Sequence, residues 1–294
     1  MAPADHIQNF SYATEDDPRL RRLLIRAVER MTGQPYLKRL YDEHRTNPVP
    51  GESFWAAAIR NLELNIVFNR DALMKLPASE PLVIVANHPF GVLDGLIISY
   101  LASQVRNDFR VLTNSVLYQA EEIRDHLLPI DFAETKEALG TNLKSRAAAK
   151  AHLMRGGCLV IFPAGGASTA PKPWSKRAVD AEWKNFSARL IVAAKAPVAP
   201  VYFAGQNSRL FQIASHISMT LRLSLFFKEV YDKIGGEIHV RVGDVIPYSQ
   251  LEKLDRKTLM EHLRKATYAL GAAVPHGKIR GRRPRLARSP RKTS

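Results

Sequence analysis

Residues 82–86 read Leu-Val-Ile-Val-Ala and lead directly into residues 87–95, which read Asn-His-Pro-Phe-Gly-Val-Leu-Asp-Gly. A short apolar run rich in β-branched residues predicts a strand buried on both faces, as in a parallel sheet. His88 and Asp94 then lie just beyond the end of a buried strand. Enzymes of the α/β class carry their functional groups at this edge of the sheet.

His88 and Asp94 are a candidate base and the acid that orients it. Histidine titrates nearest neutrality, and a neighbouring carboxylate fixes its tautomer and stabilises its protonated form. A purely structural explanation is open as well. Asp94 precedes a helix expected near 95–105, and an aspartate oxygen commonly accepts hydrogen bonds from the free N–H groups of a helix start.

Strands and helices alternate along most of the chain. Apolar runs and period-two alternation predict strands near residues 62–68, 81–86, 109–113, 129–132, 158–162, 198–203 and 237–242. Further helices are expected near 119–127, 142–155, 180–195, 207–217 and 255–270. This alternation predicts an α/β fold with a mainly parallel, mixed sheet flanked by helices. We expect this α/β domain to cover residues 62–275.

An N-terminal helical section is expected over residues 1–61. Apolar residues recur at helical spacing between Leu20 and Met31, and shorter helices are expected near 35–44 and from about Ser53. The section either packs on the main domain or forms a membrane-facing foot, with its arginines at the lipid headgroups.

The chain is strongly basic, with a formal net charge of +15 over 294 residues. Residues 276–294 hold eight Lys and Arg and no acidic residue, so we expect a disordered basic tail there. A basic surface suits an anionic membrane, an acidic acyl carrier protein, the phosphates of coenzyme A, or nucleic acid. Nucleic acid is the least favoured partner, because no aromatic residues that would stack bases are interleaved in the tail.

The number of cysteines and the length of the apolar runs indicate the cellular location of the protein. Cys158 is the single cysteine, which excludes a disulfide framework and indicates a reducing compartment. No apolar run approaches the roughly 20 residues that span a bilayer, and the N-terminus lacks a signal-peptide pattern. We therefore expect a cytoplasmic protein associated peripherally with the inner face of the membrane.

Two later segments extend the pattern of the first. Cys158-Leu-Val-Ile-Phe-Pro163 is followed by Ala-Gly-Gly-Ala-Ser168, and Ala196-Pro-Val-Ala-Pro-Val-Tyr-Phe203 follows a helical stretch. In order and spacing the three blocks resemble the glycerolipid acyltransferase family, over about residues 62–246. The Asn-His-Pro-Phe-Gly and Phe-Pro-Ala-Gly sequences look most similar to its hemolysin-like branch.

The resemblance implies transfer of a fatty acyl chain from coenzyme A or acyl carrier protein to a lysolipid-like acceptor. His88 would take the proton from the acceptor hydroxyl or amine, and Asp94 would orient His88. The thioester donor is a co-substrate, and we expect no metal or other cofactor, because no His/Cys cluster and no dinucleotide fingerprint is present. The expected substrate-binding residues are Asn87, Phe90, Gly91, Phe162, Pro163, Gly165, Gly166, Ser168 and Arg209.

Three departures from the common family pattern affect the His88–Asp94 pair and the acceptor. Five residues instead of four separate His88 from Asp94. The usual Phe-Pro-Glu-Gly-Thr-Arg-Ser block here carries Ala164 and Ala167, without its acid and arginine, and Phe132 stands where an Ile-Asp-Arg block has its arginine. Without forked arginine contacts a glycerol phosphate is a poor fit, so a lysolipid with another headgroup, such as an amino-acid lipid, is favoured. Arg209 is a candidate replacement cation.

Two other functions remain open from the residues alone. Gly166-Ala-Ser-Thr-Ala170 approaches the Gly-x-Ser-x-Gly nucleophile elbow of serine hydrolases and thioesterases, although Pro171 and Pro173 oppose the helix that this elbow requires. A catalytically inactive lipid- or acyl-carrier-binding protein would fit the lost Glu and Arg residues. Retention of both His88 and Asp94 argues against it.

Overall fold

The computed structural model describes residues 11, 13, 18–114, 121–130, 135–274 and 281. In this part of the chain seven strands form one sheet in the order β1-β7-β6-β2-β5-β3-β4. The strands are β1 (Asn65–Phe68), β2 (Leu82–Ala86), β3 (Arg110–Asn114), β4 (Leu127–Ile130), β5 (Cys158–Ile161), β6 (Val198–Phe203) and β7 (Glu237–Val242).

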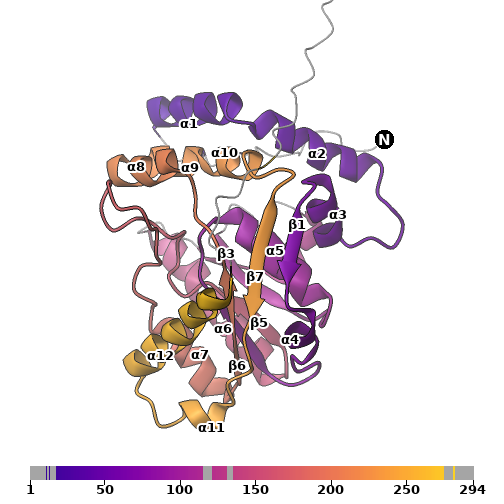
Figure 1. The fold of residues 1–294 in the computed structure, drawn as a ribbon, viewed down its shortest axis with the longest axis vertical. Helices are drawn as coiled ribbons and strands as arrows, with labels where there is room; N and C mark the ends of the chain where they lie inside the picture. The colour runs from indigo at the N-terminus through magenta and orange to yellow at the C-terminus, as the bar shows by residue number, and fades with distance from the viewer. Residues whose placement is uncertain are drawn as a thin grey trace, which may run out of the picture.

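Helices flank this sheet along the described chain (Figure 1). The α-helices are α1 (Arg19–Met31), α2 (Gln34–Thr46), α3 (Phe54–Asn61), α4 (Arg70–Met74), α5 (Val92–Ser103), α6 (Lys136–Met154), α7 (Phe186–Ala194), α8 (Arg209–Ile217), α9 (Met219–Ser224), α10 (Phe226–Tyr231), α11 (Tyr248–Leu251) and α12 (Arg256–Ala269). Two 3₁₀ helices, η2 (Glu121–His126) and η3 (Leu270–Ala273), complete the set.

The sheet is mainly parallel, as the alternation of strands and helices predicts. β2 lies between β5 and β6 and pairs with both in parallel, with Leu82 opposite Cys158 and Val83 opposite Val198. Only the pairing of β6 with β7 is antiparallel among the described strands. The predicted α/β fold class is therefore confirmed.

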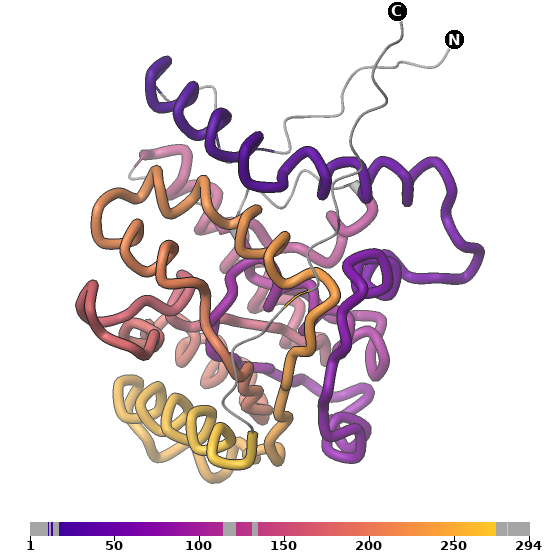
Figure 2. Tube along the Cα trace, turned by 45° about the horizontal axis from the view of Figure 1, so that its top comes forward, coloured from indigo at the N-terminus to yellow at the C-terminus, as the bar shows by residue number. Residues whose placement is uncertain are grey.

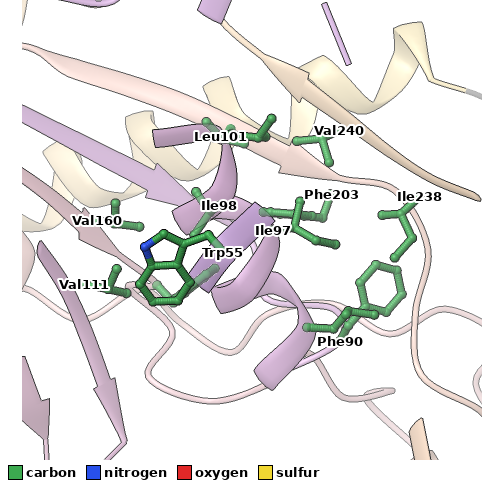
Figure 3. Packing of buried hydrophobic residues seen from close by; sticks show 14 of the residues in the cluster. Trp55, Phe90, Ile97, Ile98, Leu101, Val111, Val160, Phe203, Ile238 and Val240 are labelled. Atoms are coloured by element: carbon green, nitrogen blue, oxygen red, sulfur yellow. The ribbon is translucent and has the colours of Figure 1, made fainter. Parts of the chain in front are cut away.

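The core lies on both faces of the sheet because successive side chains of a strand point to opposite faces. All five residues of β2 are buried. Leu82 and Ile84 pack in a cluster with α3 and α5, which includes Trp55 and Ile97 (Figure 3). Val83 and Val85 pack on the other side against α6, α7 and α12.

Several element boundaries differ from the predicted ones. α5 begins at Val92 rather than near residue 95, so Asp94 lies inside its first turn. α6 begins at Lys136, where the Thr135 hydroxyl accepts a hydrogen bond from the Ala138 N–H and caps the helix. The helix expected from residue 180 begins at Phe186, and a bridge between Thr169 and Val179 closes a loop earlier in the chain.

Helices α8, α9 and α10 lie beside one end of the sheet, and α1 and α2 lie over them (Figures 1 and 2). α1 contacts α9, and α2 contacts α10. Ile25 and Leu37 lie in the same apolar cluster as Trp55, so the N-terminal helices share the core of the α/β domain. The domain boundary at residue 61 stays a prediction, and the basic tail 276–294 lies outside the described residues except for Gly281.

Candidate functional site

The turn between β2 and α5 brings His88 and Asp94 together. His88 lies two residues after the buried strand β2, and Asp94 lies in the first helical turn of α5. His88 Nδ1 lies 3.0 Å from Asp94 Oδ2. The five intervening residues therefore do not prevent the pairing that the sequence predicts.

Gly91 absorbs the additional residue of this turn. Its φ is +80°, a conformation that side chains disfavour, and a Cβ at this position would lie 2.3 Å from the Phe226 ring. Asp94 Oδ2 accepts hydrogen bonds from the Phe90 N–H (2.8 Å) and the Gly91 N–H (2.9 Å). One Asp94 oxygen thus accepts the hydrogen bonds at the start of the helix and also faces the His88 imidazole, so the geometry accommodates the helix-capping explanation together with the histidine-orienting one.

Asp94 is fully buried, whereas the His88 side chain is 17% exposed. Burial raises the pKa of Asp94 above its usual value, and His88 together with the Phe90 and Gly91 amides opposes that rise. With Nδ1 directed at the carboxylate, His88 Nε2 is the nitrogen left to accept a proton. Nε2 has no partner among the described residues, so it is free to meet an incoming group.

The loop after β5 forms the second wall of the site. The Phe162 ring stacks on the His88 imidazole with centroids 4.1 Å apart, and the Ser168 N–H donates to the His88 carbonyl (2.7 Å). Pro163 accepts a hydrogen bond from the Lys184 N–H, which ties the loop to the chain before α7. The Phe-Pro block is therefore adjacent to the histidine block.

The backbone N–H groups of Gly91, Gly165 and Gly166 differ in whether they are free to donate to a developing oxyanion. The Gly91 N–H donates to Asp94, and the Gly165 N–H donates to the Phe162 carbonyl (2.9 Å). Within the described ranges the Gly166 N–H has no protein acceptor, so it is the available donor of the three.

Neither Ser168 nor the single cysteine, Cys158, has the environment of a nucleophile. The Ser168 hydroxyl donates to Asp180 Oδ1 (2.5 Å), not to an imidazole, and no helix follows it at once. The Cys158 thiol is buried, which raises its pKa to about 12 and keeps it protonated at neutral pH. The arrangement does not match the nucleophile elbow of a serine hydrolase.

Asp180 is a functional-site residue that the sequence did not single out. Its Oδ1 accepts from the His88 N–H (3.1 Å) as well as from Ser168, and its Oδ2 accepts from Trp183 Nε1 (2.9 Å). Its own N–H donates to the Tyr268 hydroxyl on α12 (2.8 Å). This buried carboxylate therefore joins the turn between β2 and α5 to the loop after β5, although it lies 92 residues from His88 in the sequence and no local pattern marks it.

Asn87 and Phe90 are buried and fix the turn between β2 and α5 to the rest of the protein. Asn87 pairs with the backbone of Phe203 in both directions, donating to its carbonyl (2.9 Å) and accepting from its N–H (2.7 Å). The Phe90 ring lies 5.2 Å from Lys233 Nζ. These contacts position the loop, and direct substrate binding by Asn87 and Phe90 stays a prediction.

Lys233 belongs to a buried polar network under this loop. Its ammonium donates to Glu229 Oε2 (2.9 Å) and Asn207 Oδ1 (3.0 Å), and Ser208 Oγ donates to Glu229 Oε1 (2.5 Å). Burial works against ionisation of Glu229, but Lys233 and the Ser208 contacts hold its pKa below the usual value. The network connects α10 to the start of α8.

Arg209 lies at the rim rather than beside His88. It is exposed, and its guanidinium donates to the carbonyl oxygens of Pro173 (3.1 Å) and Ser175. Its role as a substrate-binding cation stays a prediction. No group of three or more His, Cys, Asp or Glu side chains in the described part of the chain is arranged to hold a metal ion.

Residues 22–277 match the family model described as "Acyltransferase". The chain belongs to this acyltransferase family. The match covers the N-terminal helices together with both walls of the site. The predicted enzyme class, an acyltransferase, is therefore confirmed. His88 and Asp94 lie together within the matched residues.

Two curated relatives of this acyltransferase are lyso-glycine lipid O-acyltransferases. The protein of Phocaeicola vulgatus is 25% identical over 213 residues, which is 69% of this chain and 72% of the relative. That of Bacteroides thetaiotaomicron is 25% identical over 239 residues, which is 74% of this chain and 82% of the relative. A solved structure, the 1-acyl-sn-glycerophosphate (LPA) acyltransferase PlsC of Thermotoga maritima, aligns at 13% identity and a TM-score of 0.49, covering 86% of this chain and 96% of that one.

Proposed function

We propose that this acyltransferase moves a fatty acyl chain from a thioester of coenzyme A or acyl carrier protein onto the hydroxyl of a lysolipid with an amino-acid headgroup. The observation that carries the proposal is the Nε2 of the partly exposed His88, which has no partner among the described residues, while Nδ1 faces the buried Asp94 in a chain of this family. We also place the chain in the hemolysin-like branch, on the Asn-His-Pro-Phe-Gly and Phe-Pro-Ala-Gly sequences.

The chemistry follows from the free nitrogen. His88 Nε2 removes the proton of the acceptor hydroxyl while the hydroxyl oxygen attacks the thioester carbonyl. Asp94 stabilises the imidazolium that forms. The Gly166 N–H donates to the oxyanion of the tetrahedral intermediate. When the intermediate collapses, the C–S bond breaks and the leaving thiolate takes the proton back from His88. No covalent enzyme intermediate is needed.

The acceptor assignment rests on two independent observations. Ala164 and Ala167 stand where the resembled family has an acid and an arginine, and that arginine is a group that would hold a phosphate. Phe132, at the position of a second such arginine, lies outside the described residues. The two relatives carry the name lyso-glycine lipid O-acyltransferase. An amino acid joined to a fatty acid through its amine keeps a carboxylate, which gives an acceptor without phosphate.

The acceptor is tested by competition between two lysolipids. With the same labelled acyl donor, we expect a lyso-glycine lipid to be acylated with a kcat/KM at least about tenfold above that of lysophosphatidate, the equivalent of about 1.4 kcal/mol in transition-state binding. The measurement is the labelled product separated by chromatography. Efficient, saturable acylation of lysophosphatidate with no reaction of the lyso-glycine lipid would refute the assignment.

We further propose that the helical layer of α1, α8 and α9 attaches the enzyme peripherally to an anionic membrane. Exposed apolar residues follow one stripe of α1 at Leu20, Leu23, Leu24 and Met31, and continue on α8 and α9 at Ile213, Ile217 and Met219. α1 also carries arginines at 19, 21, 22, 26 and 30. None of the described helices is long and apolar enough to span a bilayer. An apolar stripe beside arginines is the pattern of an interfacial helix.

Replacing both Leu20 and Leu24 with serine is expected to weaken binding to anionic liposomes by about 10- to 100-fold, because each leucine loses its apolar transfer energy. Sedimentation of protein with vesicles, at low and high salt, measures this. The matched control is serine at Leu139 and Leu143, which are similarly exposed on α6. Equal losses for the two double variants, or none for either, would contradict the proposed surface.

A further inference from the structure

Arg222, on α9, contacts the loop after β5 and lies outside the three sequence blocks that resemble the family. Its Nη2 donates to the Ala167 carbonyl (2.6 Å), and its Nη1 donates to Thr169 Oγ1 (3.0 Å). Ala167 stands where the resembled family has the arginine of its Phe-Pro block. A guanidinium from a distant element therefore lies beside the position whose own arginine is missing.

This guanidinium is connected to His88 through a single peptide group of the loop after β5. The carbonyl that Arg222 binds and the Ser168 N–H that donates to the His88 carbonyl belong to the same peptide group. Gly166, the residue with the free N–H, is also adjacent, because a Cβ at this glycine would lie 3.7 Å from Arg222 Nη2. Arg222 thus borders the place where the acceptor must meet His88.

The charge of Arg222 is not neutralised by the described part of the chain. No carboxylate there forms an ion pair with it, and its neighbours are a carbonyl, a hydroxyl and the Phe211 ring, 5.6 Å from the guanidinium carbon. Burial lowers its pKa, but a guanidinium stays protonated at neutral pH. Two of its five N–H donors are used in these contacts and the other three have no acceptor among the described residues, so a forked pair of hydrogen bonds is still available.

We propose that Arg222 binds the headgroup carboxylate of the lysolipid acceptor and so selects amino-acid lipids, an inference that rests on the proposed function. A partly buried cation without an acid partner is costly unless an anion completes it. The acceptor carboxylate does so, and it fixes the headgroup on one side of the Ala167–Ser168 peptide group while the hydroxyl approaches His88. A phosphate of the donor has related chemistry, and the experiment separates the two.

The test compares a lyso-glycine lipid with its primary amide, in which the carboxylate is neutralised. We expect the wild-type enzyme to prefer the carboxylate, and Arg222→Gln to lower kcat/KM for it by about 10- to 100-fold through a higher acceptor KM. The KM of the acyl donor and the kcat/KM of the amide acceptor should stay within about twofold. Arg189→Gln, on the exposed side of α7, is the matched control and should change neither acceptor.

Other outcomes separate the role of Arg222 from the proposed function. Equal acylation of both lipids by the wild-type enzyme, or an equal loss of both in the variant, would overturn the carboxylate contact while the proposed function stands. A raised donor KM would assign Arg222 to the donor phosphates instead. Failure of the wild-type enzyme to acylate either lipid would overturn both. If Arg222→Gln does not fold, Arg222→Lys keeps the charge without the fork and should show a smaller loss, again confined to the carboxylate lipid.

Discussion

Replacing His88 with alanine is expected to lower acyl transfer by about 10²- to 10⁴-fold, the usual contribution of a positioned general base. The alanine removes the only free imidazole nitrogen at the end of β2 and leaves Asp94 bonded to the Phe90 and Gly91 amides. The loss should appear in kcat, because the imidazole acts on the proton in the transition state. Initial rates with saturating donor and acceptor measure it.

The same change should leave the protein folded. The His88 backbone groups, which bind Asp180 and Ser168, remain in the variant. Circular dichroism and thermal unfolding check this. His239→Ala, on β7, removes a partly exposed imidazole that pairs with Glu237 and should keep full activity. Turnover of the His88 variant within a fewfold of wild type would remove His88 from the mechanism.

Asp94→Asn is expected to lower kcat by about 10²-fold or more with little effect on stability. An asparagine oxygen can still accept the Phe90 and Gly91 N–H groups, but a neutral amide neither holds the imidazole tautomer nor stabilises an imidazolium. Asp94→Ala removes the two hydrogen bonds as well and should also destabilise the protein by about 0.5–2 kcal/mol, the usual cost of losing a helix cap.

The raised pKa of Asp94 determines whether Asp94→Asn increases or decreases the stability of the protein. Because burial raises the folded pKa above the unfolded one, the stability linked to Asp94 is complete below the unfolded pKa and is lost as pH rises through the folded pKa. Asparagine has no such ionisation, so at neutral pH the variant should unfold at the same temperature or higher. Unfolding curves between pH 5 and 8 check this. Lower stability of the asparagine variant at neutral pH would show that the ionised carboxylate stabilises the fold.

The strands of this protein could be predicted because each is marked by the pattern of apolar residues within its own short segment. β2 and β5 are continuous apolar runs, and burial on both faces of a parallel sheet requires that composition. The pairing of His88 with Asp94 could be predicted as well, since both residues lie in one short turn. Gly91 is the physical reason the longer spacing works, because its positive φ lets the turn double back.

The rest of the site depends on contacts between distant parts of the chain. Asp180 sits in a loop with no motif, and its importance comes from meeting His88, Ser168 and Trp183 together. Arg222 is one of many arginines, and only the packing of α9 against the loop after β5 brings it to Ala167. Such residues acquire a role from tertiary structure, and residue type and spacing do not reveal it.

The short helices α4, α9, α10 and α11 were missed for a related reason. Each has six residues or fewer, too short to show the periodicity that predicts a helix. α9 and α10 nevertheless carry Arg222, Glu229 and the Phe226 ring that contacts the Gly91 turn. The unpredicted helices thus hold much of what surrounds the catalytic turn.

The intact mass of the enzyme during turnover tests the central claim, direct acyl transfer with His88 as the base. The enzyme is mixed with the thioester donor alone, and then with donor and lyso-glycine lipid together. We predict an unmodified enzyme mass in both mixtures and acylated lipid in the second. An enzyme heavier by one acyl group, with the adduct on Ser168 and chased by the lipid, would contradict the account and establish a serine nucleophile.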